Sequence, residues 1–450
     1  MLSDRNPLVN SAQKFIPIES CRKSPRRLDQ RLVLRHHLIH AGLVHSQARF
    51  SRAFGLRIMK SQDIARCHPN VLQVGLWMVP SMGGMGKTVE LFGLALKTDV
   101  VSFTDGPMLD QEGSAVEGAE HIRIDPGWLG RFYSWAPASA RLKADSLAEH
   151  ANLIACHTMF RYHVHWARTW VRKKQIPYWV VPHGCLDPYV FSYRAWQKKP
   201  WMRLIGRRHL REAAAVIFAS RREMEKAAPH LSRDNGRVIH WPVTDRVLPP
   251  QVRTEARANW RTELGANDAD RLLVFLGRMH SMKRPVETMK CFSEASTTRS
   301  HLVIAGPDGD HSRSDLEALA RGNPKIHFLE PVWGDRKATL LAAADGYISL
   351  SHRENFGFSG AESLKVGLPV ILSPGNDLAG ELGSVGCGWL LPDLSDRAAI
   401  AAIRAFDRAS DDDLATMGAS GRAWAERELS FEKFASSLRS LAEETLSAKR

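Results

Sequence analysis

One stretch decides the fold of this chain: Asp345-Gly-Tyr-Ile-Ser-Leu-Ser351, then His-Arg-Glu354-Asn-Phe-Gly-Phe-Ser-Gly-Ala-Glu362, and, after a short gap, Pro369-Val-Ile-Leu-Ser373. The first and last segments are short and apolar, which is typical of buried parallel strands. Between them, Ser359 and Gly360 begin a helix that Gly367 and Pro369 end. The stretch therefore predicts a strand, a loop, a helix and a strand, which is a βαβ unit.

The loop and the helix start of this unit carry groups that suit a ligand with both phosphates and hydroxyls. Glu354 lies in the loop, and Glu362 lies about one turn inside the helix. At Gly357 the helix N-terminus offers free backbone N–H groups and the positive end of the helix dipole, which together bind anions. Carboxylates beside an anion site predict a nucleotide sugar as the ligand. Either glutamate alone is equally compatible with an ordinary βα loop.

Length and composition predict a globular protein of several domains. The 450 residues are enough for two or three separate cores, and 44% hydrophobic and 24% charged residues are ordinary shares. No uninterrupted apolar run reaches ~18 residues, so the sequence predicts no membrane-spanning helix. The 6 cysteines lie far apart without a C-x-x-C pair, which argues against structural zinc and disulfides and favours a reducing cytoplasm.

The net charge of +14 is unevenly distributed. Residues 1–70 hold 13 Lys and Arg against 4 Asp and Glu, which is 13 − 4 = +9 and leaves 14 − 9 = +5 for the rest of the chain. We therefore attribute the high pI mainly to this segment and expect no nucleic-acid partner. Three interpretations of the segment stay open: a flexible basic arm, an arm for a membrane surface or acidic partner, and translation that starts downstream, for instance at Met59.

A strand, a glycine-rich turn and a helix come next. The strand is expected in Val71-Leu-Gln-Val-Gly-Leu-Trp-Met-Val-Pro80 and the turn in Ser81-Met-Gly-Gly-Met-Gly86, and the helix runs to about Lys97. This order is typical of the opening of a Rossmann-like domain.

The same turn supports an alternative, a P-loop-type ATPase. Met82-Gly-Gly-Met-Gly-Lys-Thr88 resembles the deviant Walker motif, in which Lys87 and Thr88 would hold a phosphate and Mg²⁺. The standard motif requires glycine in place of Ser81, and the deviant form requires lysine in place of Met82. The nearest strand with an acidic end, Val100–Asp105, fits a Rossmann unit equally well, so the ATPase is the less favoured interpretation.

A further strand ends in a histidine. The segment Ile176-Pro-Tyr-Trp-Val-Val-Pro-His183-Gly-Cys-Leu-Asp187-Pro is rich in β-branched and aromatic residues and stops at Pro-His-Gly. Ligands of open α/β sheets bind outside the carboxyl ends of the strands. His183 is therefore expected to face the ligand, although a histidine in this place is also compatible with a structural role.

Two cations follow the first strand of the second half. That strand, Arg271-Leu-Leu-Val-Phe-Leu-Gly277, comes after a polar, proline-containing segment that suits a linker, and it leads into Arg278-Met-His-Ser-Met-Lys283. Arg278 and Lys283 lie between a strand end and a helix start, where they can hold a diphosphate. On their own they fit equally well as exposed basic residues.

One segment combines aromatic and basic residues. Trp196-Gln-Lys-Lys-Pro-Trp-Met-Arg-Leu-Ile-Gly-Arg-Arg-His-Leu-Arg211 holds two Trp and six Lys or Arg. As a helix it is compatible with contact to an anionic membrane surface, and equally with a solvated helix whose Trp side chains pack inward.

These motifs together resemble the retaining, GT-B-fold glycosyltransferases of family 4, of the type that builds surface polysaccharide. The resemblance covers roughly residues 71–445 and is most specific at 271–375. It rests on the two glutamates eight positions apart around Asn-Phe-Gly, on Gly-Arg-x-x-x-x-Lys, and on Pro-His-Gly-x-Leu-Asp-Pro. The chain departs from the family at Trp241-Pro242, where members usually have Asn-Gly.

The resemblance implies an α/β fold of two Rossmann-like domains with a cleft between them. The acceptor domain would span residues 71–243, the linker 244–268, and the nucleotide-sugar domain 269–428. A C-terminal helix, within residues 429–450, would cross back onto the first domain.

The resemblance also implies roles for single residues. Arg278 and Lys283 would neutralise the leaving diphosphate, and Glu354 would position the transferred sugar. With His183, which would contact the sugar or diphosphate, they form the expected catalytic set. The expected donor-binding residues are Gly83, Gly84, Gly334, Asn355, Phe356, Gly357 and Glu362, of which Glu362 would bind the ribose. Asp187 would help shape the acceptor pocket.

The implied reaction is transfer of a hexosyl unit from a UDP- or GDP-linked sugar to a glycan or lipid-linked acceptor, with retention of configuration. The resemblance implies neither a cofactor nor a metal. The expected location is cytoplasmic, with peripheral contact at the inner face of the cell membrane as an open alternative. A non-enzymatic sugar- or nucleotide-binding protein on the same scaffold also stays open.

Overall fold

The computed structural model describes residues 69–76, 84–103, 121–124, 138–243, 247–320 and 322–448. All of the described residues belong to one compact unit within Ala65–Arg450. Most of the predicted basic arm, and Gly83 in the glycine-rich turn, lie outside the described residues.

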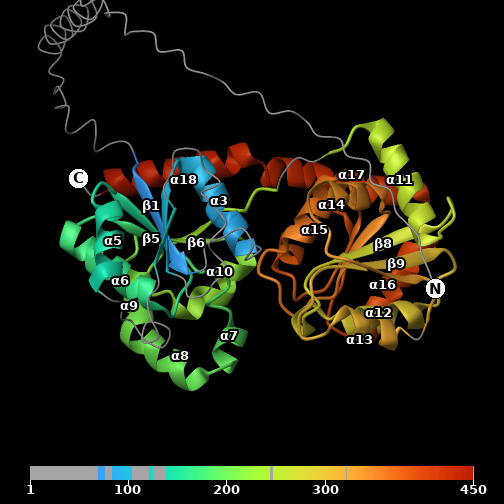
Figure 1. Ribbon diagram of the computed structural model, residues 1–450, viewed down its shortest axis with the longest axis horizontal. Coiled ribbons are helices and arrows are strands. Elements are labelled where there is room, and N and C mark those ends of the chain that lie inside the picture. Colours follow the sequence, from blue (N-terminus) through green and yellow to red (C-terminus); the bar gives the residue numbers. More distant parts are fainter. Residues whose placement is uncertain are drawn as a thin grey trace, which may run out of the picture. The chain divides into compact units, whose positions relative to one another are not determined.

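The first domain contains a parallel sheet of 7 strands in the order β3-β2-β1-β4-β5-β6-β7. The strands are β1 (Val71–Leu76), β2 (Asp99–Phe103), β3 (His121–Ile124), β4 (Leu153–His157), β5 (Tyr178–Val181), β6 (Ala215–Phe218) and β7 (Gly236–Val238). The helices are α3 (Gly84–Leu96), α5 (Ala138–Ala148), α6 (Tyr162–Lys174), α7 (Pro188–Ser192), α8 (Ala195–Trp201), α9 (Arg207–Glu212) and α10 (Arg221–Ala227), and a π-helical turn, Met202–Gly206, joins α8 to α9 (Figure 1).

Helices cover both faces of this sheet, which explains why its strands are apolar throughout. In β5, Trp179 and Val181 belong to one apolar core, whereas Tyr178 and Val180 belong to another. Successive side chains of a strand point to opposite faces, so a strand with two buried faces shows a continuous apolar run.

The second domain contains a parallel sheet of 6 strands in the order β10-β9-β8-β11-β12-β13. The strands are β8 (Arg271–Leu276), β9 (Ser300–Ala305), β10 (Ile326–Leu329), β11 (Gly346–Ser349), β12 (Val370–Leu372) and β13 (Gly388–Leu390). The helices are α11 (Pro250–Leu264), α12 (Pro285–Ala295), α13 (Arg313–Leu319), α14 (Gly334–Ala343), α15 (Phe358–Lys365), α16 (Asp396–Arg408) and α17 (Asp411–Glu428), with short 3₁₀ turns at Ser281–Lys283 and Asp377–Glu381. The predicted βαβ unit is β11-α15-β12.

Helix α11 occupies most of the segment predicted as a linker, residues 244–268. It packs against α14, and the buried Arg261 donates to Ala343 O (3.2 Å) and to Asp345 Oδ2 (2.8 Å). These contacts make α11 part of the second domain, which begins near Pro250 rather than at 269.

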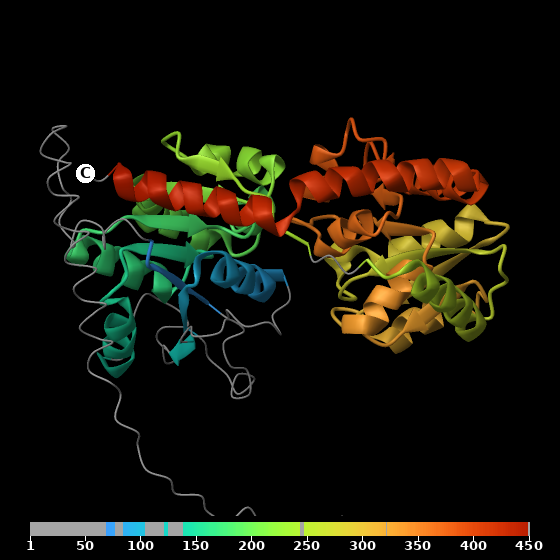
Figure 2. The same cartoon turned by 90° about the horizontal axis from the view of Figure 1, so that it is seen from above.

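The C-terminal helix α18 (Phe431–Ser447) packs against α3 of the first domain, as predicted (Figure 2). Trp179 Nε1 donates to Thr445 Oγ1 (3.0 Å), and the Phe434 ring meets the rings of Phe92 and Trp241 edge-on. Trp241, 2% exposed, thus fills the space beneath the helix, which gives the departure from Asn-Gly a packing reason.

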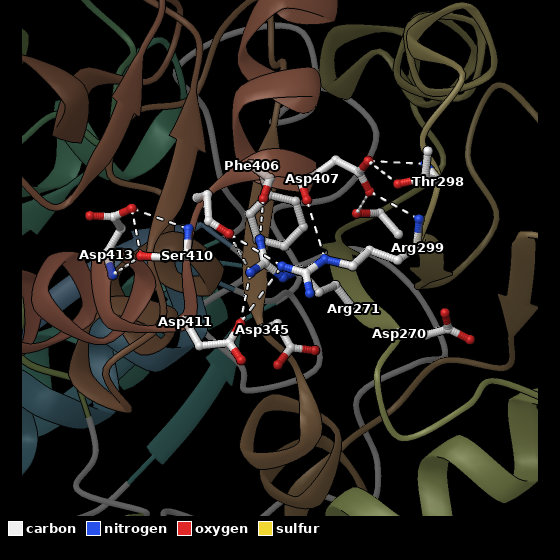
Figure 3. Close-up of polar contacts among 12 residues, drawn as sticks. Asp270, Arg271, Thr298, Arg299, Asp345, Phe406, Asp407, Ser410, Asp411 and Asp413 are labelled. Carbon is white, nitrogen blue, oxygen red and sulfur yellow. Dashed lines mark hydrogen bonds and ion pairs between the residues drawn. The ribbon is translucent and has the colours of Figure 1, made fainter.

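A polar network secures the amino ends of β8 and β9 to the corner between α16 and α17 (Figure 3). The buried Arg271 donates to Phe406 O (2.5 Å), Ala409 O (2.5 Å) and Asp411 Oδ1 (2.7 Å). Asp407 accepts from Thr298 N (3.0 Å) and Ser300 Oγ (2.6 Å). The network lies at the edge of the sheet opposite to the carboxyl ends of the strands.

Candidate functional site

The strand order of the second sheet reverses between β8 and β11, and the predicted cations and carboxylate follow these two strands. In open α/β sheets, ligands bind at such a switch point outside the carboxyl ends of the strands. Arg278 follows β8, Lys283 ends the 3₁₀ turn after it, and Glu354 follows β11. His352 N donates to Met282 O (2.7 Å) and so joins the two loops.

Lys283 and Glu354 form an ion pair at this point, with 27% and 19% of their side chains exposed. Burial and the nearby Arg278 lower the pKa of Lys283 to about 8. The Arg278 side chain itself is exposed. Glu354 N donates to Gly375 O (2.8 Å), and Asp377 N donates to Glu354 O (2.9 Å). The loop is therefore held on both sides while its charged groups remain partly open to solvent.

The turn into α15 requires glycine. Gly357 has φ +76°, and a Cβ there would lie 2.9 Å from Asn376 Nδ2. The Phe356 side chain is buried, 3% exposed, and its ring packs edge-on against the Phe358 ring, which stabilises the turn. The α15 N-terminus therefore starts directly beside Glu354, where its dipole favours an anion.

Glu362 lies between two lysines. Lys87 Nζ of α3 approaches Glu362 Oε1 at 2.9 Å, and Lys337 of α14 pairs with Oε2. Burial opposes ionisation of this carboxyl, but the two lysines outweigh it and lower its pKa. Thr88 is buried and donates to Gly84 O (2.9 Å) within α3, so both side chains named for the ATPase alternative have partners inside the protein.

Two other predicted glycines lie near Glu362. A Cβ on Gly84 would lie 3.2 Å from the Phe358 ring, so the start of α3 lies close against the start of α15. Gly334, with φ +54°, is the first residue of α14, and Lys337 follows it by one turn. The Lys337–Glu362 pair therefore brings the start of α14 to the same site.

In the first domain, His183 follows β5 in a left-handed backbone conformation, with φ +51°. Its Nε2 lies 2.9 Å from Nδ1 of His157, the buried last residue of β4, and the two rings stack. Burial lowers the pKa of His183 to about 4 and lowers that of His157 well below its usual range. Both rings are therefore neutral near pH 7.

The Pro-His-Gly turn is held from both domains. Gly184 N donates to Glu223 Oε1 (2.7 Å), and Arg353 of the second domain donates to Gly184 O (2.6 Å). Burial raises the pKa of Glu223 to about 7, although this carboxyl also accepts from Ala219 N (2.7 Å) and from Asn355. Asn355 thus reaches the first domain through Glu223.

Asp187 has a structural role in these contacts. Its side chain caps α7 by accepting from Tyr189 N (2.9 Å), and it pairs with Lys226 (2.9 Å) and Arg353 (3.3 Å). Burial opposes its ionisation, but Lys226 and the backbone bond outweigh it and lower the pKa of Asp187. Lys226 also pairs with the buried Asp377 (2.6 Å).

Most of the predicted site residues that the structure describes take part in these contacts, whereas the Arg278 side chain is exposed and Gly334 is placed by its position at the start of α14. The structure adds Lys337, His157, Glu223 and Lys226, and it gives Lys87 a partner that the sequence did not suggest. Their partners lie in other elements, so local spacing carries no signal for them. Within the described ranges, no group of three or more His, Cys, Asp or Glu side chains is arranged to hold a metal ion.

Two family models match this chain. The model described as Glycosyl transferases group 1 matches residues 256–424, and Glycosyltransferase Family 4 matches residues 82–245. Together they cover well over half of the chain.

Curated relatives match over shorter segments. A D-inositol 3-phosphate glycosyltransferase of a Nocardioides species is 30% identical over 194 residues, which is 38% of this chain and 42% of that protein. The corresponding protein of Mycolicibacterium gilvum is 30% identical over 186 residues, 38% of this chain and 40% of that protein. The chain thus spans about two fifths of the length of these relatives.

Solved structures match over most of the chain. The Anabaena protein HepE, in complex with UDP and glucose, has a TM-score of 0.66 at 17% identity and covers 85% of this chain and 100% of its own. The sucrose-phosphate synthase of Thermosynechococcus elongatus has a TM-score of 0.65 at 18% identity, and the match covers 84% of this chain and 100% of that protein. At this identity the likeness concerns the fold, and it confirms the predicted GT-B architecture. The chain therefore has a GT-B fold, with a segment that matches Glycosyltransferase Family 4 in the first domain and a segment that matches Glycosyl transferases group 1 in the second.

Proposed function

We propose that this protein is a retaining glycosyltransferase that moves a hexosyl unit from a UDP- or GDP-linked sugar to a glycan or lipid-linked acceptor. The observation that carries the proposal is the arrangement of Arg278, Lys283 and Glu354 with the α15 N-terminus at the switch point of the second sheet. It offers positive charge for a diphosphate directly beside a carboxylate for sugar hydroxyls.

The chemistry follows from where charge develops. The bond between the anomeric carbon and the β-phosphate oxygen breaks, the acceptor oxygen forms a new bond to that carbon, and the acceptor proton is released. Negative charge then accumulates on the β-phosphate. Arg278, Lys283 and the N–H groups at the start of α15 stabilise this charge in the transition state.

In this mechanism the two glutamates position the nucleotide sugar and do not transfer protons. Glu354 accepts hydrogen bonds from the transferred sugar, and Glu362, kept ionised by Lys87 and Lys337, accepts them from the nucleotide ribose. A reactant held in one orientation reacts faster because the entropy of alignment is already lost on binding.

The names of the matched proteins support the donor class. HepE was solved with UDP and glucose and also with UDP-glucose, and the curated relatives are named glycosyltransferases. The hexosyl unit, the acceptor and a place in polysaccharide biosynthesis belong to the proposal, as does a cytoplasmic location.

Contact with a membrane surface is part of the same proposal. Segment 193–211 exposes apolar side chains among its basic residues, namely Tyr193 (61% exposed), Trp196 (74%) and Leu204 (75%). None of the described helices is both long and apolar enough to span a bilayer. Aromatic and aliphatic side chains that project from a basic helical segment suit the interface of an anionic bilayer. A lipid-linked acceptor would reach the enzyme at that surface.

The donor is identified by a thermal-shift screen with UDP-, GDP- and ADP-sugars, followed by transfer assays with and without EDTA. A ligand at 100 times its Kd stabilises the folded state by ~2.7 kcal/mol, so the true donor raises the melting temperature. We expect either the UDP-sugars or the GDP-sugars to raise the melting temperature. We also expect EDTA to leave the rate of sugar transfer unchanged. The proposal fails if no nucleotide sugar shifts the melting temperature, or if the protein instead hydrolyses ATP and Lys87→Ala abolishes that activity.

A further inference from the structure

Lys87 belongs to none of the motifs that define the family resemblance, yet it reaches the centre of the proposed donor site. It lies in the first turn of α3, in the first domain, and its Nζ is 2.9 Å from Glu362 Oε1. The same ammonium lies over the Phe358 ring, 4.9 Å from its centroid. The contact therefore joins the start of α3 to α15, in the second domain.

The geometry of the Glu362 carboxylate leaves room for a ligand. Lys87 occupies one oxygen and Lys337 the other. An ionised carboxylate offers about four acceptor sites on its two oxygens. Two sites therefore remain, which is the number that the neighbouring hydroxyls of one ribose require. The two lysines fix the plane of the carboxylate before the ligand arrives.

Lys87 adds little to folding through this pair. Its side chain is 28% exposed, and partly exposed ion pairs contribute little to stability because solvent screens them. A bound nucleotide would cover the pair and exclude water, which strengthens the interaction between its charges. The contribution of Lys87 is therefore expected in ligand binding rather than in the melting temperature.

We propose that Lys87 is a positioning residue for the donor. It holds the ionised Glu362 toward the ribose hydroxyls and makes donor affinity depend on helix α3 of the first domain. The inference rests on the proposed function, because the ligand is taken to be a nucleotide sugar.

The test compares Lys87→Met and Lys87→Arg with the matched control Lys97→Met, which alters an exposed lysine at the other end of α3. Calorimetry measures the Kd of UDP and GDP and of their 2′-deoxy forms. For whichever nucleotide binds, we expect Lys87→Met to raise the Kd about tenfold, or ~1.4 kcal/mol, and to reduce the preference for ribose over deoxyribose. Lys87→Arg retains both properties, and Lys97→Met behaves as the wild type.

Three results would overturn the inference. The Lys87→Met variant could bind UDP or GDP as tightly as the wild type, it could lose affinity for the ribo and deoxy forms equally, or Lys87→Arg could bind as poorly as Lys87→Met. Each of these leaves the proposed function in place, because the wild type still binds the nucleotide. Failure of the wild type to bind either nucleoside diphosphate would overturn both proposals.

Discussion

At the scale of single residues, the buried histidines link stability to pH. His209 in α9 is fully buried and stacks on the Tyr178 ring, and neither of its ring nitrogens has a hydrogen-bond partner among the described residues. Burial lowers its pKa to about 3. Below pH ~6.5 the His209 imidazole therefore binds a proton in the unfolded chain but stays neutral in the folded chain. The free energy of unfolding consequently decreases as the pH falls.

The first prediction concerns His209→Phe, which keeps a stacked ring and removes the titration. At pH 7 we expect the variant to match the wild type or exceed its stability by ~1 kcal/mol, because two unpaired polar atoms disappear. At pH 5 its advantage should grow by ~2 kcal/mol. Urea unfolding at both pH values measures this. If the free energy of unfolding changed by the same amount between pH 7 and pH 5 in the wild type and in the variant, the low pKa assigned to His209 would be contradicted.

Single residues also show what the sequence reveals. The positions of Arg278, Lys283 and Glu354 after two strands suggested a shared site, because parallel strands end at one edge of a sheet, and the family resemblance implied their roles. The Lys87–Glu362 pair was not predicted, because it depends on how α3 is placed against α15, and no local pattern encodes that placement. The contact between His157 and His183 was not predicted either, because His157 ends β4 and His183 follows the next strand, β5.

At the scale of elements, local signals found the strands and helices but not always the domain to which they belong. The apolar runs and the glycine and proline positions predicted β11-α15-β12 with its correct order. Helix α11 lies in a polar segment, and its attachment to the second domain depends on the buried Arg261 and on Asp345, far along the chain. Polar composition alone therefore made it resemble a linker.

The second prediction tests the network at the corner between α16 and α17 (Figure 3). Asp407→Ala leaves the donors of Thr298 and Ser300 without their acceptor, and the loss is costly at Ser300, which is buried. We expect a loss of ~3 kcal/mol in the free energy of unfolding and unchanged turnover for the molecules that remain folded. Asp412→Ala, at an exposed position of α17, serves as control and should cost under ~1 kcal/mol. Equal stability of the two variants would contradict the role of the network.

At the scale of the whole molecule, charge is divided between the domains. Residues 71–243 hold 23 Lys and Arg against 15 Asp and Glu, or 23 − 15 = +8, whereas residues 247–448 hold 23 against 28, or 23 − 28 = −5. The net charge of the chain outside residues 1–70 is small because the positive charge of the first domain is partly cancelled by the negative charge of the second. The high pI therefore comes from the first domain as well as from residues 1–70. A basic first domain with exposed apolar side chains supports the proposed contact with an anionic surface.

The third prediction follows from that division. Vesicles containing anionic lipid should sediment the wild type at low salt, and uncharged vesicles should not. The double variant Trp196→Ser, Leu204→Ser should lose most of this binding, because it removes the two most exposed apolar side chains of the segment. The matched control, Leu319→Ser, alters an exposed leucine of α13 in the second domain. Binding by the double variant equal to that of the wild type would remove the membrane surface from the proposal.

The central claim is that the cations after β8 stabilise the leaving diphosphate, and Lys283→Ala tests it most directly. The control is Lys290→Ala, which removes an exposed lysine of α12. With the donor found in the screen, we expect Lys283→Ala to lower turnover about a hundredfold, or ~3 kcal/mol, at an unchanged melting temperature. Lys290→Ala should transfer sugar as the wild type does. Near-normal transfer by the Lys283→Ala variant would contradict the account.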